Sequence, residues 1–192
     1  MKDRLLVLDT ETGGLDPSRF SILSVGAVIW DDGTLGEEIE LPIAEASIVT
    51  DPTSLAINQI DPKIHSLTAL PVEHAASRFV GYLRRNFPSL SQGEKITIVG
   101  HNVAFDMGFL RRFLRLGNEN FDYYFSHRSV DTAAILKFLM LAGRVSIRSP
   151  SSTEAFDYFG IQIPDQKRHT ALGDARATAE LLNSLLGLIK VT

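Results

Sequence analysis

Residues 5–17, LLVLDTETGGLDP, determine how the rest of the chain is interpreted. The apolar run at their start leads directly into Asp9 and Glu11, which are two positions apart. Because side chains alternate between the two faces of a strand, both carboxylates lie on the same side of a strand predicted over residues 4–9. Neighbouring carboxylates repel each other unless a cation lies between them, so this stretch predicts a cation site at a strand end.

Two later blocks have the same construction. Asp106 stands in VGHNVAFDMGFL, and His169 and Asp174 stand in RHTALGDARATAELL. Each residue alone has an ordinary explanation, since a carboxylate in the first turn of a helix complements its positive end and a single histidine is usually a surface or packed residue. Acids at three separate strand or helix ends, with a histidine, are hard to explain by capping. The pattern predicts a metal-dependent enzyme with oxygen ligands for Mg²⁺ or Mn²⁺.

Composition limits the class of protein. A chain of 192 residues suits one domain over residues 1–192, and it contains no cysteine, which excludes thiolate chemistry and is compatible with the reducing cytoplasm. Neither a signal peptide nor a long apolar run is present, so we expect a soluble cytoplasmic protein with no membrane partner. A net charge of −4 argues against coating nucleic acid through bulk electrostatics, but not against a nuclease with an acidic site.

Hydrophobic periodicity predicts an α/β fold with a mixed five-stranded sheet flanked by helices. Between Pro42 and Pro71 the pattern is irregular, which predicts loop and short helical turns. The predicted strands cover residues 4–9, 22–30, 37–43, 96–100 and a short run near 128–131, with an Asp-Gly turn in DDGT at 31–34. The predicted helices cover residues 72–87, 104–116, TAAILKFLML, a brief helix from Ser152 or Thr153 to Gly160, and roughly 172–188.

Together the three acidic blocks resemble the DEDDh branch of the DnaQ-like 3′→5′ exonucleases, which have a ribonuclease H-like fold. DTETGGLDP matches the first motif, HNVAFDMGFL the second and HTALGDA the third, in which histidine rather than tyrosine precedes the last aspartate. The resemblance implies hydrolysis of terminal phosphodiesters of DNA or RNA with release of nucleoside 5′-monophosphates. It also implies two divalent metal ions, Mg²⁺ or Mn²⁺, held by Asp9, Glu11, Asp106 and Asp174, and His169 as general base.

The resemblance further implies where substrate binds. The backbone of Thr12 and Gly13 and the side chain of Leu15 would line the pocket for the 3′ end, while Asn102 or Phe105 would contact the strand. Alternatives remain, because two consecutive glycines after Thr12 also suit a plain turn and Phe105 suits the core.

Basic residues offer a second kind of contact. Seven of them are candidates for a local phosphate-binding surface, although an exposed charged helix face is the simpler explanation for the first pair. They are Arg84, Arg85, Arg111, Arg112, Arg115, Lys167 and Arg168.

Asp131 matches an aspartate that is frequent in the family, and a supporting role is predicted for it.

The sequence departs from the family pattern in two places. INQIDPKIHSL replaces the usual His-Gly-Ile-Thr run, which leaves Asn58 or Gln59 at the histidine position and predicts altered substrate selection. GRVSIRSPSST lacks the usual Asn-Ser-Leu start of the next helix, although its serines can still cap it.

Three functions are compatible with these residues. We favour a stand-alone exonuclease acting on single-stranded or 3′-end-accessible nucleic acid. A proofreading subunit of a DNA polymerase is the alternative, disfavoured because the chain stops soon after its last helix. A catalytically inactive nucleic-acid-binding module is less favoured, because all five key positions are filled. A DNA polymerase and a second copy of the chain are the other candidate partners.

Overall fold

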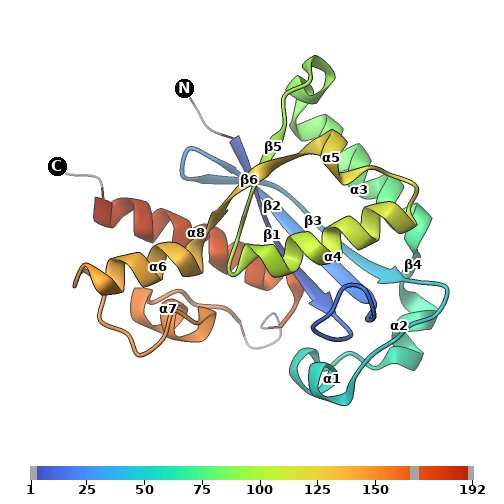
Figure 1. Cartoon of the computed structure of the whole chain (residues 1–192), viewed down its shortest axis with the longest axis horizontal. Helices are drawn as coiled ribbons and strands as arrows, with labels where there is room; N and C mark the ends of the chain where they lie inside the picture. Colours follow the sequence, from blue (N-terminus) through green and yellow to red (C-terminus); the bar gives the residue numbers. More distant parts are fainter. Residues whose placement is uncertain (1–3, 165–168, 190–192) are drawn as a thin grey trace.

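A computed structural model describes residues 4–164 and 169–189, which form a mixed β-sheet with helices on both faces (Figure 1). The strands in this part of the chain are β1 (Arg4–Thr12), β2 (Ile22–Asp31), β3 (Thr34–Ala44), β4 (Leu70–Pro71), β5 (Ile96–Gly100) and β6 (Phe125–Asp131). Their order in the sheet is β4-β3-β2-β1-β5-β6. β2 is antiparallel to β1 and β3, whereas β5 runs parallel to β1, β6 to β5 and β4 to β3. The acidic strand β1 is therefore an interior strand.

The helices of the described residues cover the sheet on both sides. They are α1 (Pro52–Asn58), α2 (Pro62–Thr68), α3 (Val72–Asn86), α4 (Val103–Leu116), α5 (Phe121–Tyr124), α6 (Thr132–Leu141), α7 (Ser152–Phe159) and α8 (Ala171–Ile189), with a 3₁₀ turn η1 (Pro88–Gln92). α3 and α4 pack on one face and α8 on the other, and α6 and α7 lie beside α8 (Figure 1). No helix within the described residues is long and apolar enough to cross a bilayer.

The alternation of side chains along β1 divides the core. Leu6 and Leu8 are fully buried in the cluster formed with α3 and α4, whereas Val7 is fully buried on the opposite face, beneath α8. Residues 9–11 continue the alternation, so Asp9 and Glu11 face α8 and Thr10 faces α4.

The predicted fold class is confirmed, with one difference in strand number. The prediction has five strands and the sheet has six, because Leu70–Pro71 pairs with β3 as the edge strand β4. Two residues are too few to produce a hydrophobic period, so only tertiary pairing reveals this strand. In the irregular segment, α1 and α2 each begin at an Asp-Pro pair whose aspartate caps the helix.

The other predicted elements form close to their expected bounds. β5 covers the predicted residues, and β6 begins at Phe125, a few residues earlier than predicted. The Asp-Gly turn lies at Asp32 and Gly33, whose φ angles are 50° and 92°. Positive φ at both positions is typical of the two-residue hairpin turn.

The first turn of α8 lies directly against the backbone of β2 at Gly26. A Cβ on this glycine would lie 2.1 Å from Leu172 N and 2.2 Å from Ala171 C, so only glycine permits the approach. Gly26 is the β2 partner of Asp9. The contact therefore places the start of α8 beside the acidic end of β1.

The second half of α8 is held on the same strand by side-chain hydrogen bonds. The Trp30 indole Nε1 donates to Asn183 Oδ1 at 2.7 Å, and Asn183 Nδ2 donates to Gly33 O at 2.9 Å. Trp30 is 6% exposed. α8 is thus fixed to β2 near both of its ends.

We expect Gly26→Ala to destabilise the protein by about 1–3 kcal/mol, because the added methyl group overlaps the backbone of α8. Gly36→Ala on neighbouring β3 is the matched control, since its Cβ would meet Ile29 at an ordinary 3.4 Å. Urea unfolding measures both variants. Equal midpoints for the two would contradict the close packing of α8 on β2.

Candidate active site

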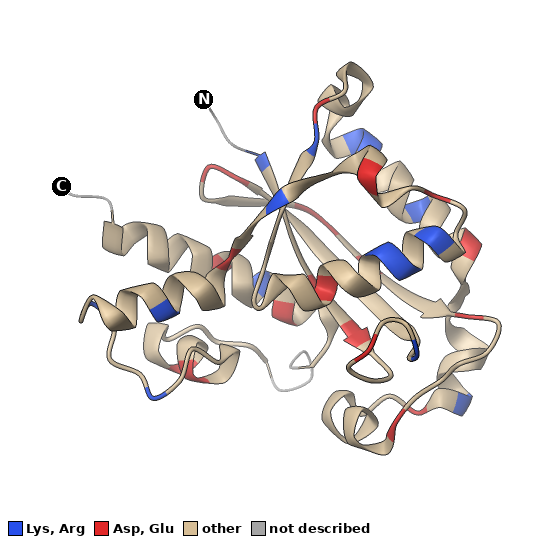
Figure 2. Ribbon diagram, in the orientation of Figure 1, with Lys and Arg blue, Asp and Glu red and all other residues tan. Residues whose placement is uncertain are grey.

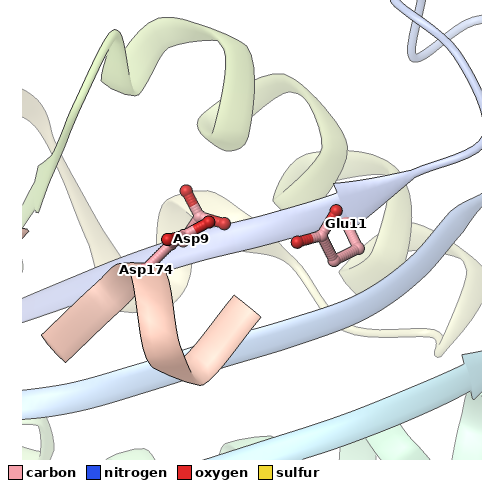
Figure 3. Close-up of side chains that lie close together, drawn as sticks. All are labelled: Asp9, Glu11 and Asp174. Atoms are coloured by element: carbon pink, nitrogen blue, oxygen red, sulfur yellow. The ribbon is translucent and has the colours of Figure 1, made fainter. Parts of the chain in front are cut away.

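Three carboxylates meet where β1 approaches the first turn of α8. Asp9 and Glu11 project from β1, and Asp174 projects from α8 (Figure 3). One oxygen from each carboxylate lies within 4.8 Å of the others, and all three residues are half-buried. Oxygen ligands at this spacing suit a hard divalent cation.

Asp106, the fourth predicted carboxylate, lies on the α4 face of β1 and is 3% exposed. Its Oδ1 accepts hydrogen bonds from the Thr10 backbone N–H at 3.0 Å and from the Thr10 hydroxyl at 2.8 Å. β5 pairs with β1 at Leu6 and Val7, so Thr10 lies beyond the end of that pairing and its amide bonds to a side chain instead. The first turn of α4 is thereby attached to β1 between the two acidic positions.

Burial and mutual repulsion oppose ionisation of these carboxyl groups. The pKa of Glu11 rises from 4.5 to about 8, first through burial and then through the negative charges of Asp174, Asp106 and Glu40. Burial raises the pKa of Asp106 from 3.8 to about 7, although its hydrogen bonds from Thr10 act in the opposite direction. Near neutral pH the site therefore holds either protons or a cation.

The metal-free protein should lose stability as pH rises from about 5 to 8. In this interval Glu11 of the unfolded chain releases a proton that the folded protein retains, since the pKa is 4.5 in the former and about 8 in the latter. The contribution is complete below the unfolded pKa and is lost as pH passes the folded pKa. For one titrating group, the free energy of unfolding decreases by at most about 1.4 kcal/mol per pH unit.

Melting temperatures in chelator across this pH range measure the effect, and the difference between wild type and Glu11→Gln isolates it. We expect the variant to show a flatter dependence and Mn²⁺ to raise the wild-type melting temperature most at pH 8. Identical pH profiles for the two proteins would contradict the raised pKa of Glu11.

His169 lies two residues before α8, and it is not part of the three-carboxylate cluster. Its φ is 60°, and the next residue, Thr170, caps the helix by accepting a hydrogen bond from Gly173 N at 3.1 Å. Lys167 and Arg168 lie outside the described residues. The imidazole lines a pocket whose other residues come from α7 and the segment after it: Thr153, Phe156, Asp157, Ile161, Gln162 and Ile163.

Asp131 forms hydrogen bonds at the ends of β5 and β6, and its supporting role in the site stays a prediction. Its Oδ1 accepts the backbone N–H groups of Ala133 and Ala134, which caps α6, and that of Asn102 at 3.0 Å. Asn102, with φ 64°, forms the turn from β5 into α4. Its contact with substrate stays a prediction, as does that of Phe105, which packs against the core.

The loop after β1 uses its backbone groups internally. Gly13 N donates to Ser21 O at 2.8 Å, and Gly13 O accepts from Asp51 N at 2.7 Å. The Leu15 side chain, in contrast, is 79% exposed. Of the three predicted contacts in this segment, Leu15 has the side chain most open to a ligand, and substrate binding by Thr12 and Gly13 stays a prediction.

Asn58 is one of the two candidates for the family's histidine position. It is attached by a hydrogen bond to Thr12, where β1 leads into the loop. It is 8% exposed, its Nδ2 donates to Thr12 O at 3.0 Å, and its Oδ1 accepts from Ile60 N at 3.1 Å. Gln59 is instead the left-handed C-cap of α1. Asn58 thus holds the end of β1 through hydrogen bonds.

Most of the predicted phosphate-binding arginines are already engaged within the protein. Basic residues lie along α4 (Figure 2). The side chain of Arg112, however, is only 15% exposed, so its prediction as a phosphate ligand is wrong. Arg84 lies 3.4 Å from the Tyr124 hydroxyl. The ion pairs are Arg85–Glu37 at 2.9 Å, Arg111–Asp122 at 2.8 Å and Arg112–Glu45 at 2.6 Å.

Sequence reasoning missed three residues that build the site: Thr10, Gly26 and Glu45. A glycine inside the apolar run ILSVGAVIW is a recognisable signal of close backbone approach. The other two have no local signal, because their partners are distant in the sequence.

Comparison with known proteins gives matches along most of the chain. The family model described as exonuclease matches residues 6–182. A DNA polymerase III subunit epsilon-like protein of Rhodobacter capsulatus is 32% identical over 96% of this chain, which spans 24% of that protein. Ribonuclease T of Shewanella denitrificans is 29% identical over 92% of this chain and 77% of its own length. A PolC-type DNA polymerase III of Thermotoga petrophila is 27% identical, and this chain spans 12% of it.

Solved structures show the same fold at lower sequence identity. E. coli exonuclease I in complex with a dT13 oligonucleotide aligns with a TM-score of 0.79 and 16% identity over 95% of this chain and 41% of that chain. The product-bound structure of exonuclease I aligns with a TM-score of 0.76 over 99% of this chain and 44% of that one.

Proposed function

We propose a function from one premise: this chain belongs to the DnaQ-like exonuclease family, whose model it matches over residues 6–182. The proposed reaction is metal-dependent 3′→5′ hydrolysis of the terminal phosphodiester of DNA or RNA, with release of nucleoside 5′-monophosphates. Residues 1–192 act as one exonuclease domain. The observation that carries the proposal is the group of Asp9, Glu11 and Asp174, whose carboxylate oxygens lie within 4.8 Å of one another.

We propose that the site holds two divalent cations, Mg²⁺ or Mn²⁺. The clustered donors are all carboxylate oxygens, and burial followed by repulsion from neighbouring acids raises the pKa of Glu11, so a bound cation would stabilise its charged form. Asp9, Glu11, Asp106 and Asp174 would hold the ions. When bound, such a pair lowers the pKa of a water molecule and stabilises the charge on the leaving oxygen.

The chain's own residues have distinct tasks in this proposal. His169 accepts the proton of the attacking water at one imidazole nitrogen, and its place shortly before α8, the helix that carries Asp174, supports this role. Thr10 fixes the Asp106 carboxylate through two hydrogen bonds. Leu15 presents an exposed apolar surface to the terminal base.

The proposed substrate is a single strand or another end with a free 3′-hydroxyl. The exonuclease I structure with dT13 supports a DNA strand, and the similarity to ribonuclease T supports RNA, so both sugars enter the test below. A second copy of the chain is a further candidate partner.

Proofreading within a DNA polymerase is the second candidate function. The 32% identity with a DNA polymerase III subunit epsilon-like protein favours it. Copurification with a polymerase would favour the proofreading function over the stand-alone exonuclease. A binding module without catalysis is disfavoured, because all five predicted catalytic positions retain their acidic or imidazole side chains.

The decisive experiment offers 5′-labelled DNA and RNA strands with free or phosphate-blocked 3′ ends, in Mg²⁺, Mn²⁺ or chelator. We expect stepwise shortening from free 3′ ends only, abolished by chelator, and the faster strand identifies the sugar preference. Binding without shortening under every metal condition would instead favour the binding module.

A further inference from the structure

The loop that carries Leu15 connects the acidic strand to β2. We call residues 13–21 the substrate loop; it follows β1 directly and ends at the start of β2. Leu15 is 79% exposed on it. A loop that presents an apolar side chain to a ligand must be held in one place relative to Glu11, because a displaced contact contributes less to binding.

A shielded ion pair lies under this loop. Glu45, directly after β3, is joined to Arg112 of α4 by two parallel hydrogen bonds, Nε to Oε1 at 2.8 Å and Nη2 to Oε2 at 2.6 Å. Their side chains are 15% and 5% exposed for Arg112 and Glu45 respectively. The paired geometry of guanidinium and carboxylate fixes direction as well as distance.

Both partners also bond to the substrate loop or its end. Glu45 Oε2 accepts from the Ser21 hydroxyl, and Oε1 accepts from Ile22 N, each at 3.1 Å. Arg112 Nη1 donates to Pro17 O at 3.1 Å. The pair therefore holds the middle and the end of the loop at once.

The remaining loop contacts leave little free space. Ser21 Oγ accepts from Val49 N at 2.9 Å, and Ser21 N donates to Val49 O at 3.0 Å. On α4, a Cβ at Gly108 would lie 3.2 Å from the Pro17 ring. The loop is packed against α4 at the turn that Arg112 also binds.

We propose that Arg112 and Glu45 are positioning residues that hold the substrate loop so that Leu15 contacts the 3′-terminal nucleotide. This inference rests on the proposed exonuclease function. Arg112 acts through Leu15 and touches no substrate itself. The surface pair Arg85–Glu37 joins α3 to β3 with a similar ion pair but is 62% and 46% exposed and bonds to no part of the loop.

The test measures KM and kcat for a 3′-hydroxyl oligonucleotide well below the melting temperature of each variant. We expect Arg112→Met to raise KM about tenfold, which is about 1.4 kcal/mol, with kcat within about twofold. Leu15→Ala should raise KM similarly, and adding Arg112→Met to it should change little more, because both act through one contact. Arg85→Met, the matched control, should leave both constants unchanged.

Arg112→Lys retains the positive charge but cannot form the two parallel hydrogen bonds to Glu45. Its KM should therefore lie between those of wild type and Arg112→Met. If Arg112→Met does not fold, Arg112→Lys carries the test. Hydrogen exchange supplies a readout without catalysis, and we expect faster exchange at Gly13 and Ile22 in Arg112→Met than in Arg85→Met.

A lower melting temperature with unchanged KM in the Arg112 variants would overturn the proposal, and so would a full additional KM increase in the Leu15→Ala background. If wild type turns over no oligonucleotide, the proposed function fails separately. The exchange rates and the dissociation constant of the same oligonucleotide then decide the role of the pair, with unchanged values overturning it.

Discussion

Replacing Asp9 with asparagine should lower the rate of 3′-terminal hydrolysis by at least about a thousandfold while the protein stays folded. Asparagine keeps the shape of the side chain but removes one of three carboxylate charges that lie within 4.8 Å. Losing about 4 kcal/mol of charge stabilisation by metal ions in the transition state corresponds to that factor. Single-turnover degradation of a 5′-labelled strand in Mn²⁺ measures it.

Asp122→Asn is the matched control, because Asp122 is 71% exposed and pairs with Arg111 away from the cluster. We expect it to retain wild-type activity. Since the repulsion among the carboxylates decreases, Asp9→Asn should also melt at a higher temperature than wild type in chelator. Activity of Asp9→Asn within tenfold of wild type would exclude Asp9 as a metal ligand.

Replacing His169 with asparagine should lower kcat by about 10²–10⁴-fold and leave metal binding intact, because its proposed task is proton transfer and it does not belong to the carboxylate cluster. Single-turnover rates at saturating Mn²⁺ and Mn²⁺ titrations measure the two effects separately.

His127→Asn, on the exposed side of β6, tests whether loss of any histidine has the same effect. Its rate and its Mn²⁺ affinity should match those of wild type. A rate of His169→Asn within tenfold of wild type at saturating Mn²⁺ would assign the proton acceptor to another group.

Most of the candidate site could be predicted because each acidic residue stands at the end of a local element. The positions of Asp9 on a strand and of Asp174 on a helix are predicted by sequence patterns only a few residues long. These two elements meet in the structure. The placement of Asp106 could not be predicted. It depends on where the pairing of β5 with β1 ends, which leaves the Thr10 amide available, and that register is a tertiary property.

The limits for the fold have the same origin. Long periodic elements such as α4 and α8 are predictable because their apolar spacing repeats several times. β4 has two residues and α5 has four, so neither produces a repeat.

Arg112 shows why charge patterns alone mislead. Helical spacing places it with Arg111 on an outward face, yet it bonds to Glu45, which lies 67 positions away in an irregular segment. A short apolar or charged sequence pattern cannot predict an ion-pair partner that is so far away in the sequence.

The attachment of α8 to Trp30 gives the protein an intrinsic optical reporter. The chain contains one tryptophan, its indole is 6% exposed, and it donates to Asn183 on the helix that also carries Asp174. Displacement of this helix would expose the indole to water and shift its fluorescence emission to longer wavelength. Movement of the helix during metal or oligonucleotide binding can therefore be followed by stopped-flow spectroscopy without a chemical label.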